Sequence, residues 1–321
     1  MKSIGTLKRG LKTGLHTTWS LGKIIFPVTI AVSILHYTIV LEWIIKAVKP
    51  LMSLFGLPGE AAIPLVLGNI LNLYAAIGAM LTLDLTVKQV FTIALMLSFS
   101  HALLVESSIA AKVGVNLWLV AAIRIVLASL FGWIVNLAWQ GGAEQASFGF
   151  IQHSSEEISG WFPIVTNAVQ QASIGIFQLA MIVIPLMIAI QWLKEMKWVD
   201  KFSNGMSPFT RMLGMKKNTS TTLAAGILFG ISFGAGVMLQ AAKEDGVAKK
   251  DLYLAFIFLV TCHAVVEDTL IFLPLGIPVW PLLLIRLTVA IILTIVTASI
   301  WNRIEKPQRK EYDYENRHGA L

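Results

Sequence analysis

Seven ionisable side chains lie inside strongly apolar stretches of the sequence, where charge is costly. They are His101, Glu106, Arg124, His263, Glu267, Asp268 and Arg286. A charged group at the centre of a bilayer costs roughly 2.5–3.5 kcal/mol on insertion scales, so such groups usually pair or line a polar path. Carboxylates can bind a proton or a cation, and a histidine can titrate near neutral pH or hydrogen-bond a polar ligand. The set predicts a substrate or ion site, or else a structural network of buried polar pairs.

This chemistry occurs twice along the chain. The segment 100–107, SHALLVES, returns as 262–269, CHAVVEDT, so His101 and His263 are 162 positions apart. The same offset links Arg124 with Arg286. An earlier block repeats at an offset of 158, and there Gly68 matches Gly226. The chain is therefore built from two copies of one unit of roughly 120 residues, far longer than the repeats of a solenoid.

Each arginine needs a partner if it is buried in an apolar helix. Glu106 and Asp268 are the obvious partners of the two arginines, within one unit or across the two units, because a bidentate ion pair offsets much of the burial cost. The alternative is direct contact of the arginines with an anionic substrate. If the arginines hold the carboxylates, those carboxylates are less free to bind ions, so these two interpretations compete.

Composition indicates a polytopic membrane protein. The chain is 56% hydrophobic and 13% charged, with a mean hydropathy of +0.74, whereas a soluble domain carries about 25% charged residues. A single cysteine, Cys262, excludes an internal disulfide. Several apolar stretches approach the roughly 20 residues that a spanning helix needs. They cover 24–45, 61–81, 90–111, 117–138, 172–193, 221–240, 252–275 and 279–301.

Charge distribution predicts the topology. Both ends of the chain are basic, whereas the loop 139–170 contains acidic residues and no Lys or Arg. The positive-inside rule then places both termini in the cytoplasm and this loop outside. Each half must then cross the membrane an odd number of times. We therefore expect one apolar segment per half, 61–81 in the first and 221–240 in the second, to enter and leave the membrane by the same face. In this topology the only basic residues outside the cell are Lys46, Lys49 and Lys88, and two more, Arg124 and Arg286, lie within the spans.

The expected fold is an all-α polytopic membrane protein with two inverted-topology repeats. Each repeat would have about three spanning helices, an interfacial helix and a re-entrant hairpin. The interfacial helices fall at 46–58 and 198–215. The segments are a basic cytoplasmic N-terminus (1–19), repeat 1 (20–138), an external loop (139–170), repeat 2 (171–302) and a charged cytoplasmic tail (303–321), which we expect to be disordered.

Polar residues in the predicted hairpins and broken helices extend the candidate site. Asn69 and Asn72 lie in the first hairpin, and Ser107 and Thr269 adjoin the acidic residues. A polar turn at membrane depth must face a cavity or be buried in protein. Gly226, Gly230 and Gly234, spaced by four, favour close helix packing in the second hairpin.

The sequence shows no sign of an enzyme. His263 and Glu267 have the spacing of two metal ligands on one helical face. In the first unit, however, the position that matches Glu267 is the apolar Val105, and no further Cys or His ligand is nearby. No phosphate loop, serine elbow or cofactor fingerprint occurs. We expect no metal, no cofactor and no catalysis. Topology accounts for the net charge of +7, so nucleic acid is not an expected partner.

The segment 56–68, GLPGEAAIPLVLG, resembles the start of the nucleoside-recognition or "Gate" domain. That family includes concentrative nucleoside transporters, the ferrous-iron transport protein B and spore-maturation membrane proteins. The resemblance covers about residues 20–138 and 170–301. It implies an interfacial helix, a re-entrant hairpin, a broken helix and a full span in each half.

We therefore expect a cell-membrane transporter or channel-like translocator of a small polar solute, with a nucleoside-like solute implied by the resemblance. Coupling to protons or sodium would run through Glu106, Glu267 and Asp268. The alternative is a non-transporting scaffold or assembly factor of the cell envelope, as the spore-maturation relatives imply. Because two such units are small for a complete permeation path, a homo-oligomer in the bilayer is also expected.

Overall fold

The computed structural model describes residues 2–35, 39–147, 161–196, 198–243 and 246–318. Within these ranges the regular elements are helices, and the one β-type contact is an isolated bridge between Thr86 and Gln145. The first half contains α1 (Lys2–Leu35), α2 (Ile39–Ser53), a 3-10 turn (Gly59–Ala61), α3 (Ala62–Ile70), α4 (Leu73–Met80), α5 (Val87–Ser100), α6 (Leu103–Val113) and α7 (Leu117–Ala138).

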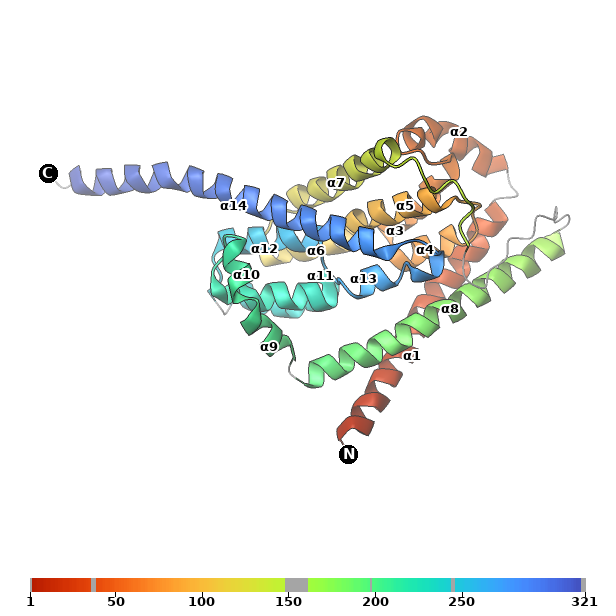
Figure 1. Cartoon of the computed structure of the whole chain (residues 1–321), viewed down its shortest axis with the longest axis horizontal. Helices are drawn as coiled ribbons and strands as arrows, with labels where there is room; N and C mark the ends of the chain where they lie inside the picture. The colour runs from red at the N-terminus through yellow and green to blue at the C-terminus, as the bar shows by residue number, and fades with distance from the viewer. Residues whose placement is uncertain (1, 36–38, 148–160, 197, 244–245, 319–321) are drawn as a thin grey trace.

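The second half repeats this order of elements (Figure 1). It contains α8 (Trp161–Glu195), α9 (Trp198–Gly205), α10 (Ser207–Met212), a 3-10 turn (Lys217–Thr219), α11 (Ser220–Lys243), α12 (Lys249–Thr261), α13 (Glu267–Leu270), a 3-10 turn (Leu273–Leu275) and α14 (Val279–His318). In this order α8 corresponds to α1, the break in α11 to the α3–α4 junction, α12 to α5, and α14 to α7.

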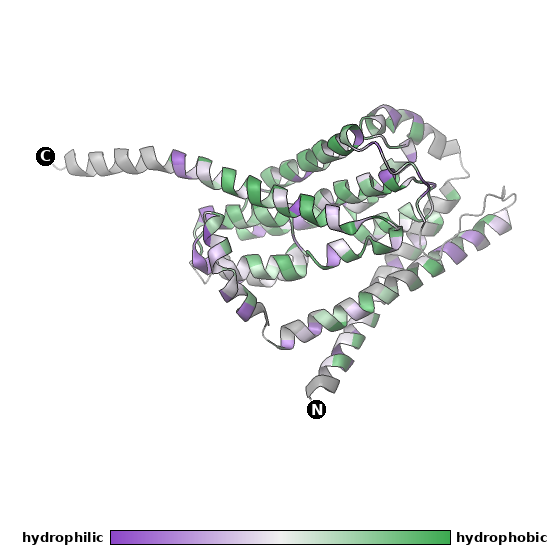
Figure 2. Cartoon of the chain, in the orientation of Figure 1, coloured by the Kyte–Doolittle hydropathy of each residue, from purple (hydrophilic) through white to green (hydrophobic). Residues whose placement is uncertain are grey.

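Three helical stretches in the described residues are long and apolar enough to cross a membrane: Val87–Val113, Leu117–Ala138 and Val279–Ile304. Figure 2 shows the hydrophobic residues concentrated along α5, α7 and α14. The outer faces of α7 and α14 leave large apolar side chains uncovered, among them Val126 and Leu284. Because a soluble surface of this kind would aggregate, these faces are suited to lipid, and the chain is a membrane protein.

Three sequence-based boundaries need correction. The apolar run 24–45 is not one helix, since α1 ends at Leu35 and α2 begins at Ile39. Helix α8 begins at Trp161, inside the range 139–170 that we expected to be a loop. The expected disorder of 303–321 is wrong for most of that range, because α14 continues to His318.

The two halves exchange equivalent segments between their cores. Four residues that follow the first histidine pack in a core formed mainly by the second half, and their counterparts 162 positions later pack in the core of the first half. The first set is Ala110, Val113, Val115 and Val120, and the second is Phe272, Leu275, Ile277 and Leu282. This reciprocal burial makes the two units one folded body.

Both predicted hairpins are interrupted where the sequence is rich in small or polar residues. Helix α3 ends before Leu71, and Asn72 caps α4 by accepting a hydrogen bond of 3.0 Å from the Ala75 N–H. In α11 the break is at Gly230, whose φ of 78° and ψ of 173° are outside the helical range. A positive φ of this kind is readily adopted only by glycine.

Helices α1 and α8 pack along each other in opposite directions. Gly10 lies against Ile188, Gly14 against Ile184 and Gly22 against Ile176. Near the start of α1 and the end of α8, the Arg9 guanidinium donates two hydrogen bonds of 2.7 Å each to the Glu195 carboxylate. Hydrogen bonds from Arg9 and from neighbouring Thr6 and Gln191 lower the pKa of Glu195 to about 2, so this pair remains ionised at neutral pH.

Replacing Gly14 with alanine should lower the free energy of unfolding by about 1–3 kcal/mol through overpacking. A Cβ at this position would come within 2.9 Å of the Ile184 Cα, so the two backbones must separate. Gly22→Ala is the matched control, because its Cβ would sit 3.6 Å from the tip of Ile176, an ordinary contact. Thermal unfolding of both variants in detergent measures the difference, and equal midpoints would argue against close α1–α8 packing.

Candidate functional site

A break in each of two helices positions the histidines. Helix α5 ends before His101, and Ala102 has a φ of 47°; α12 ends before Cys262, and Ala264 has a φ of 42°. These left-handed alanines are strained relative to glycine. Each is held by a backbone hydrogen bond to a hairpin glycine, from the Ala102 N–H to the Gly68 carbonyl at 2.8 Å and from the Ala264 N–H to the Gly226 carbonyl at 3.1 Å.

Gly68 and Gly226 allow their segments to pack closely against the helices that end at these breaks. A side chain at Gly68 would collide with Leu97, and one at Gly226 would collide with Leu259. Those two leucines are themselves 162 positions apart. The segments around Gly68 and Gly226 therefore support the broken helices in the same way in both halves.

Both imidazole rings are oriented by the helix that precedes them. Nδ1 of His101 lies 2.8 Å from the Leu97 carbonyl oxygen, and Nδ1 of His263 lies 2.7 Å from that of Leu259. Because a carbonyl oxygen can only accept, Nδ1 carries the hydrogen in each ring. Nε2 of both histidines then faces the centre of the molecule, and the ring centroids are 5.2 Å apart.

The arginines contact the carboxylates and the broken helix ends. Arg124 Nη2 lies 2.8 Å from Glu106 Oε2, and the same side chain donates to the Phe99 and His101 carbonyl oxygens. Arg124 is fully buried. These contacts support the locking role over direct contact with an anionic substrate.

The second half repeats the arrangement. Arg286 Nη2 lies 3.0 Å from Asp268 Oδ2 and donates to the His263 carbonyl oxygen at 2.8 Å. Cationic donors at the carboxyl end of a helix satisfy carbonyls that lack a helical partner. The arginines therefore stabilise both the carboxylates and the helix breaks.

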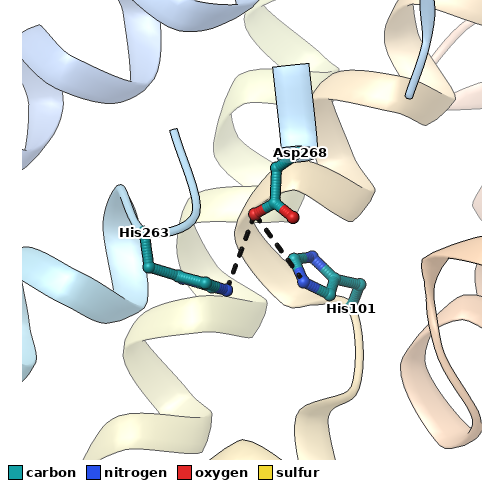
Figure 3. A group of neighbouring side chains, drawn as sticks. All are labelled: His101, His263 and Asp268. Carbon is teal, nitrogen blue, oxygen red and sulfur yellow. Dashed lines mark ion pairs between the residues drawn. The ribbon is translucent and has the colours of Figure 1, made fainter. Parts of the chain in front are cut away.

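The histidines and carboxylates of the two halves meet in one buried group, which we call the central cluster: His101, Glu106, His263 and Asp268. Nε2 of His263 is 3.1 Å from Glu106 Oε1 and 3.6 Å from Asp268 Oδ2. Nε2 of His101 is 3.8 Å and 3.9 Å from the same two oxygens. Figure 3 shows His101, His263 and Asp268 converging from three separate elements.

A partly open cavity of about 170 Å³ reaches the central cluster. Besides the cluster it is lined by Asn72, Tyr74, Gly230, Ser232 and Glu267 among others. The Tyr74 hydroxyl donates a hydrogen bond of 2.6 Å to Glu267 Oε1, which joins the first hairpin to the second half. Tyr74 was not predicted from sequence, although the hydroxyl of a tyrosine within an apolar segment needs a hydrogen-bond partner when it is buried.

Three candidate residues lie away from this cavity. The Asn69 amide donates to the Leu65 carbonyl of its own helix at 2.7 Å and lines a different cavity, near Met96 and Ser100. Ser107 and Thr269 are buried beside the acidic residues but do not line the cavity at the cluster. The structure thus gathers His101, Glu106, His263, Glu267, Asp268 and Asn72 and leaves the other three outside.

Comparison with known proteins agrees with this architecture. The family described as Gate, nucleoside recognition, matches residues 18–116 and 176–277, one match in each half. An uncharacterized membrane protein of Bacillus subtilis (strain 168), YvoD, is 55% identical over 294 residues, which cover 92% of this chain and 94% of that protein. No solved structure matches the chain. The resemblance inferred from segment 56–68 is therefore confirmed, and the chain belongs to the nucleoside-recognition (Gate) family of membrane proteins.

Proposed function

We propose that this protein is a membrane translocator of a small polar solute whose path passes the central cluster. The observation that supports the proposal is the cavity, because it is partly open and its lining includes the buried histidines and acids of both halves. A scaffold protein needs no such opening. Discontinuous helices that meet at mid-membrane are the usual setting of substrate sites in transporters with repeated units.

An inverted arrangement of the two halves is part of the proposal. At one end of the bundle, the loop after α7 bonds to the start of α5, as between Ala146 and Leu85, and Gly276 packs against Ser147. At the other end, Asn116 bonds to Tyr253. Helices α5 and α6 would then cross from the first end to the second, and α12 and α13 would cross back.

Contacts of the hairpins support re-entry. The Leu54 carbonyl, just before the first hairpin, accepts a hydrogen bond from Asn136 at the end of the bundle that also holds Lys88. The Gly68 carbonyl, in the middle of this hairpin, bonds to Ala102 at the helix break. The second hairpin starts at the opposite end, where Lys216 contacts Asp251. Gly226 reaches the break at Ala264 in the same way.

Basic residues gather at that second end, among them Lys216, Lys249 and Lys250. This bias supports a cytoplasmic location of the second end and of both termini. Because of this charge bias we propose that the protein lies in the cell membrane.

The cavity favours a small solute. Pockets for drug-sized ligands usually measure about 300–1,000 Å³, and this one measures about 170 Å³. A nucleoside would require the hairpins to move apart. We propose that coupling to protons or sodium involves Glu267, the carboxylate of the site that bonds to a tyrosine rather than to an arginine. We also propose that the protein forms a homo-oligomer.

Uptake by purified protein in liposomes tests this function. We expect accumulation of at least one labelled solute from a panel of nucleosides, amino acids and small organic ions, above protein-free vesicles. Uptake should depend on a proton or sodium gradient and should fall in Glu267→Gln. Folded protein that moves no member of such a panel under either gradient would favour the envelope scaffold instead.

A further inference from the structure

The unusual feature of the central cluster is that hydrogen-bond acceptors face one another. Since Nδ1 of each histidine donates to a backbone carbonyl, Nε2 of a neutral ring offers only a lone pair. The opposing atoms are carboxylate oxygens of Glu106 and Asp268, which also accept. The shortest of these contacts, from His263 Nε2 to Glu106 Oε1, is 3.1 Å, and a neutral ring with its hydrogen on Nδ1 has none to donate there. A cation at the centre would satisfy all of these lone pairs together.

The spacing of these atoms suits a metal ion better than direct hydrogen bonds. Three of the four Nε2–oxygen distances are 3.6, 3.8 and 3.9 Å, longer than a hydrogen bond of about 2.7–3.2 Å. Ligands at about 2.0–2.1 Å from a tetrahedral Zn²⁺ lie about 3.3 Å from one another. The ligand atoms of His101, His263 and Asp268 all lie within 4.8 Å of one another, so no pair needs to approach by more than about 1.5 Å to complete the site.

The surroundings have the features of a metal site. A histidine that binds a metal through Nε2 usually donates its Nδ1–H to a backbone carbonyl or carboxylate, as both rings do here. Arginines orient both carboxylates, with Glu106 Oε2 on Arg124 and Oε1 turned toward the histidines.

We propose that His101, His263 and Asp268, with Glu106 as the fourth ligand, bind a divalent transition-metal ion such as Zn²⁺ between the two halves (Figure 3). Two imidazoles and carboxylate oxygens suit Zn²⁺ and its neighbours rather than Mg²⁺ or Ca²⁺. The site was not expected from sequence because its ligands come from segments 162 positions apart. The proposal goes beyond translocation, since binding requires no transport.

Equilibrium binding to the chelator-treated full chain in detergent tests the site. We expect one Zn²⁺ per chain by elemental analysis, and a visible Co²⁺ spectrum of tetrahedral type. His101→Asn and His263→Asn should each weaken Zn²⁺ binding by about 100-fold or more, since losses of outer-shell partners alone cost about 10–100-fold. His16→Asn is the matched control, because His16 is exposed on α1 and should leave binding unchanged.

A second measurement needs no variant. Zn²⁺ should raise the unfolding midpoint of the wild-type protein as its concentration increases, whereas Mg²⁺ at the same concentration should not. The proposal is overturned if wild-type protein binds no Zn²⁺ and gains no stability from it, or if folded His101→Asn and His263→Asn keep wild-type affinity. Binding without uptake would contradict the proposed transport and leave the metal site standing.

Discussion

Replacing Arg124 with methionine should lower the free energy of unfolding by about 3–5 kcal/mol, the usual cost of removing one partner of a buried ion pair. The loss is large because Arg124 is fully buried and lies 2.8 Å from Glu106 Oε2. Its removal leaves Glu106 with an uncompensated charge and the Phe99 carbonyl without its donor. Denaturant or thermal unfolding in detergent measures the loss.

The double variant Arg124→Met with Glu106→Leu distinguishes an ion-pair lock from simple packing. Removing both charges should restore much of the stability, because a buried pair can often be replaced by apolar residues at little cost. Arg286→Met, alone and with Asp268→Leu, is the matched series in the second half. If Arg124→Met costs less than about 1 kcal/mol, or the double variant is as unstable as the sum of the single ones, the lock is excluded.

A tryptophan at Ser232 should reduce uptake to the level of protein-free vesicles. Ser232 lines the cavity of about 170 Å³ and is exposed, so an indole there would occupy much of this space. Ser299→Trp on the exposed face of α14 is the control, since it adds the same bulk away from the cavity. Both variants should fold and insert normally. Full uptake by folded Ser232→Trp would show that the solute does not pass this cavity.

Much of the central cluster was predictable from sequence, because a charged side chain in an apolar helix needs a partner of opposite charge. An arginine in an apolar helix requires a carboxylate, so Glu106 and Asp268 were predictable as the partners. The sequence left open which of them pairs with which arginine, and the structure pairs Glu106 with Arg124 and Asp268 with Arg286. The breaks at the histidines were also predictable from polar residues in otherwise apolar helices. The direction in which an individual polar side chain points could not be predicted from sequence. Asn69 bonds to its own helix, whereas Asn72, three positions later, caps α4 and lines the cavity.

Features that depend on contacts between distant segments could not be predicted from sequence. The exchange of Val120 and Leu282 between the two cores depends on how the halves interlock, and local patterns do not encode it. The Tyr74–Glu267 hydrogen bond joins residues that are 193 positions apart. Helix ends such as Leu35 and Trp161 are equally uncertain from sequence, because flanking apolar residues favour a helix and a core segment alike.

The most direct test concerns two equivalent surface positions, Asn116 and Pro278, which follow the broken helices of the two halves and are both exposed. Single cysteines are placed there in a Cys262→Ser background, since buried Cys262 is the native cysteine. If the halves cross the membrane in opposite directions, an impermeant maleimide will label Pro278→Cys in intact cells, and Asn116→Cys only after permeabilisation. Labelling of both cysteines from the same side would contradict the inverted arrangement and the meeting of the two halves at the central cluster.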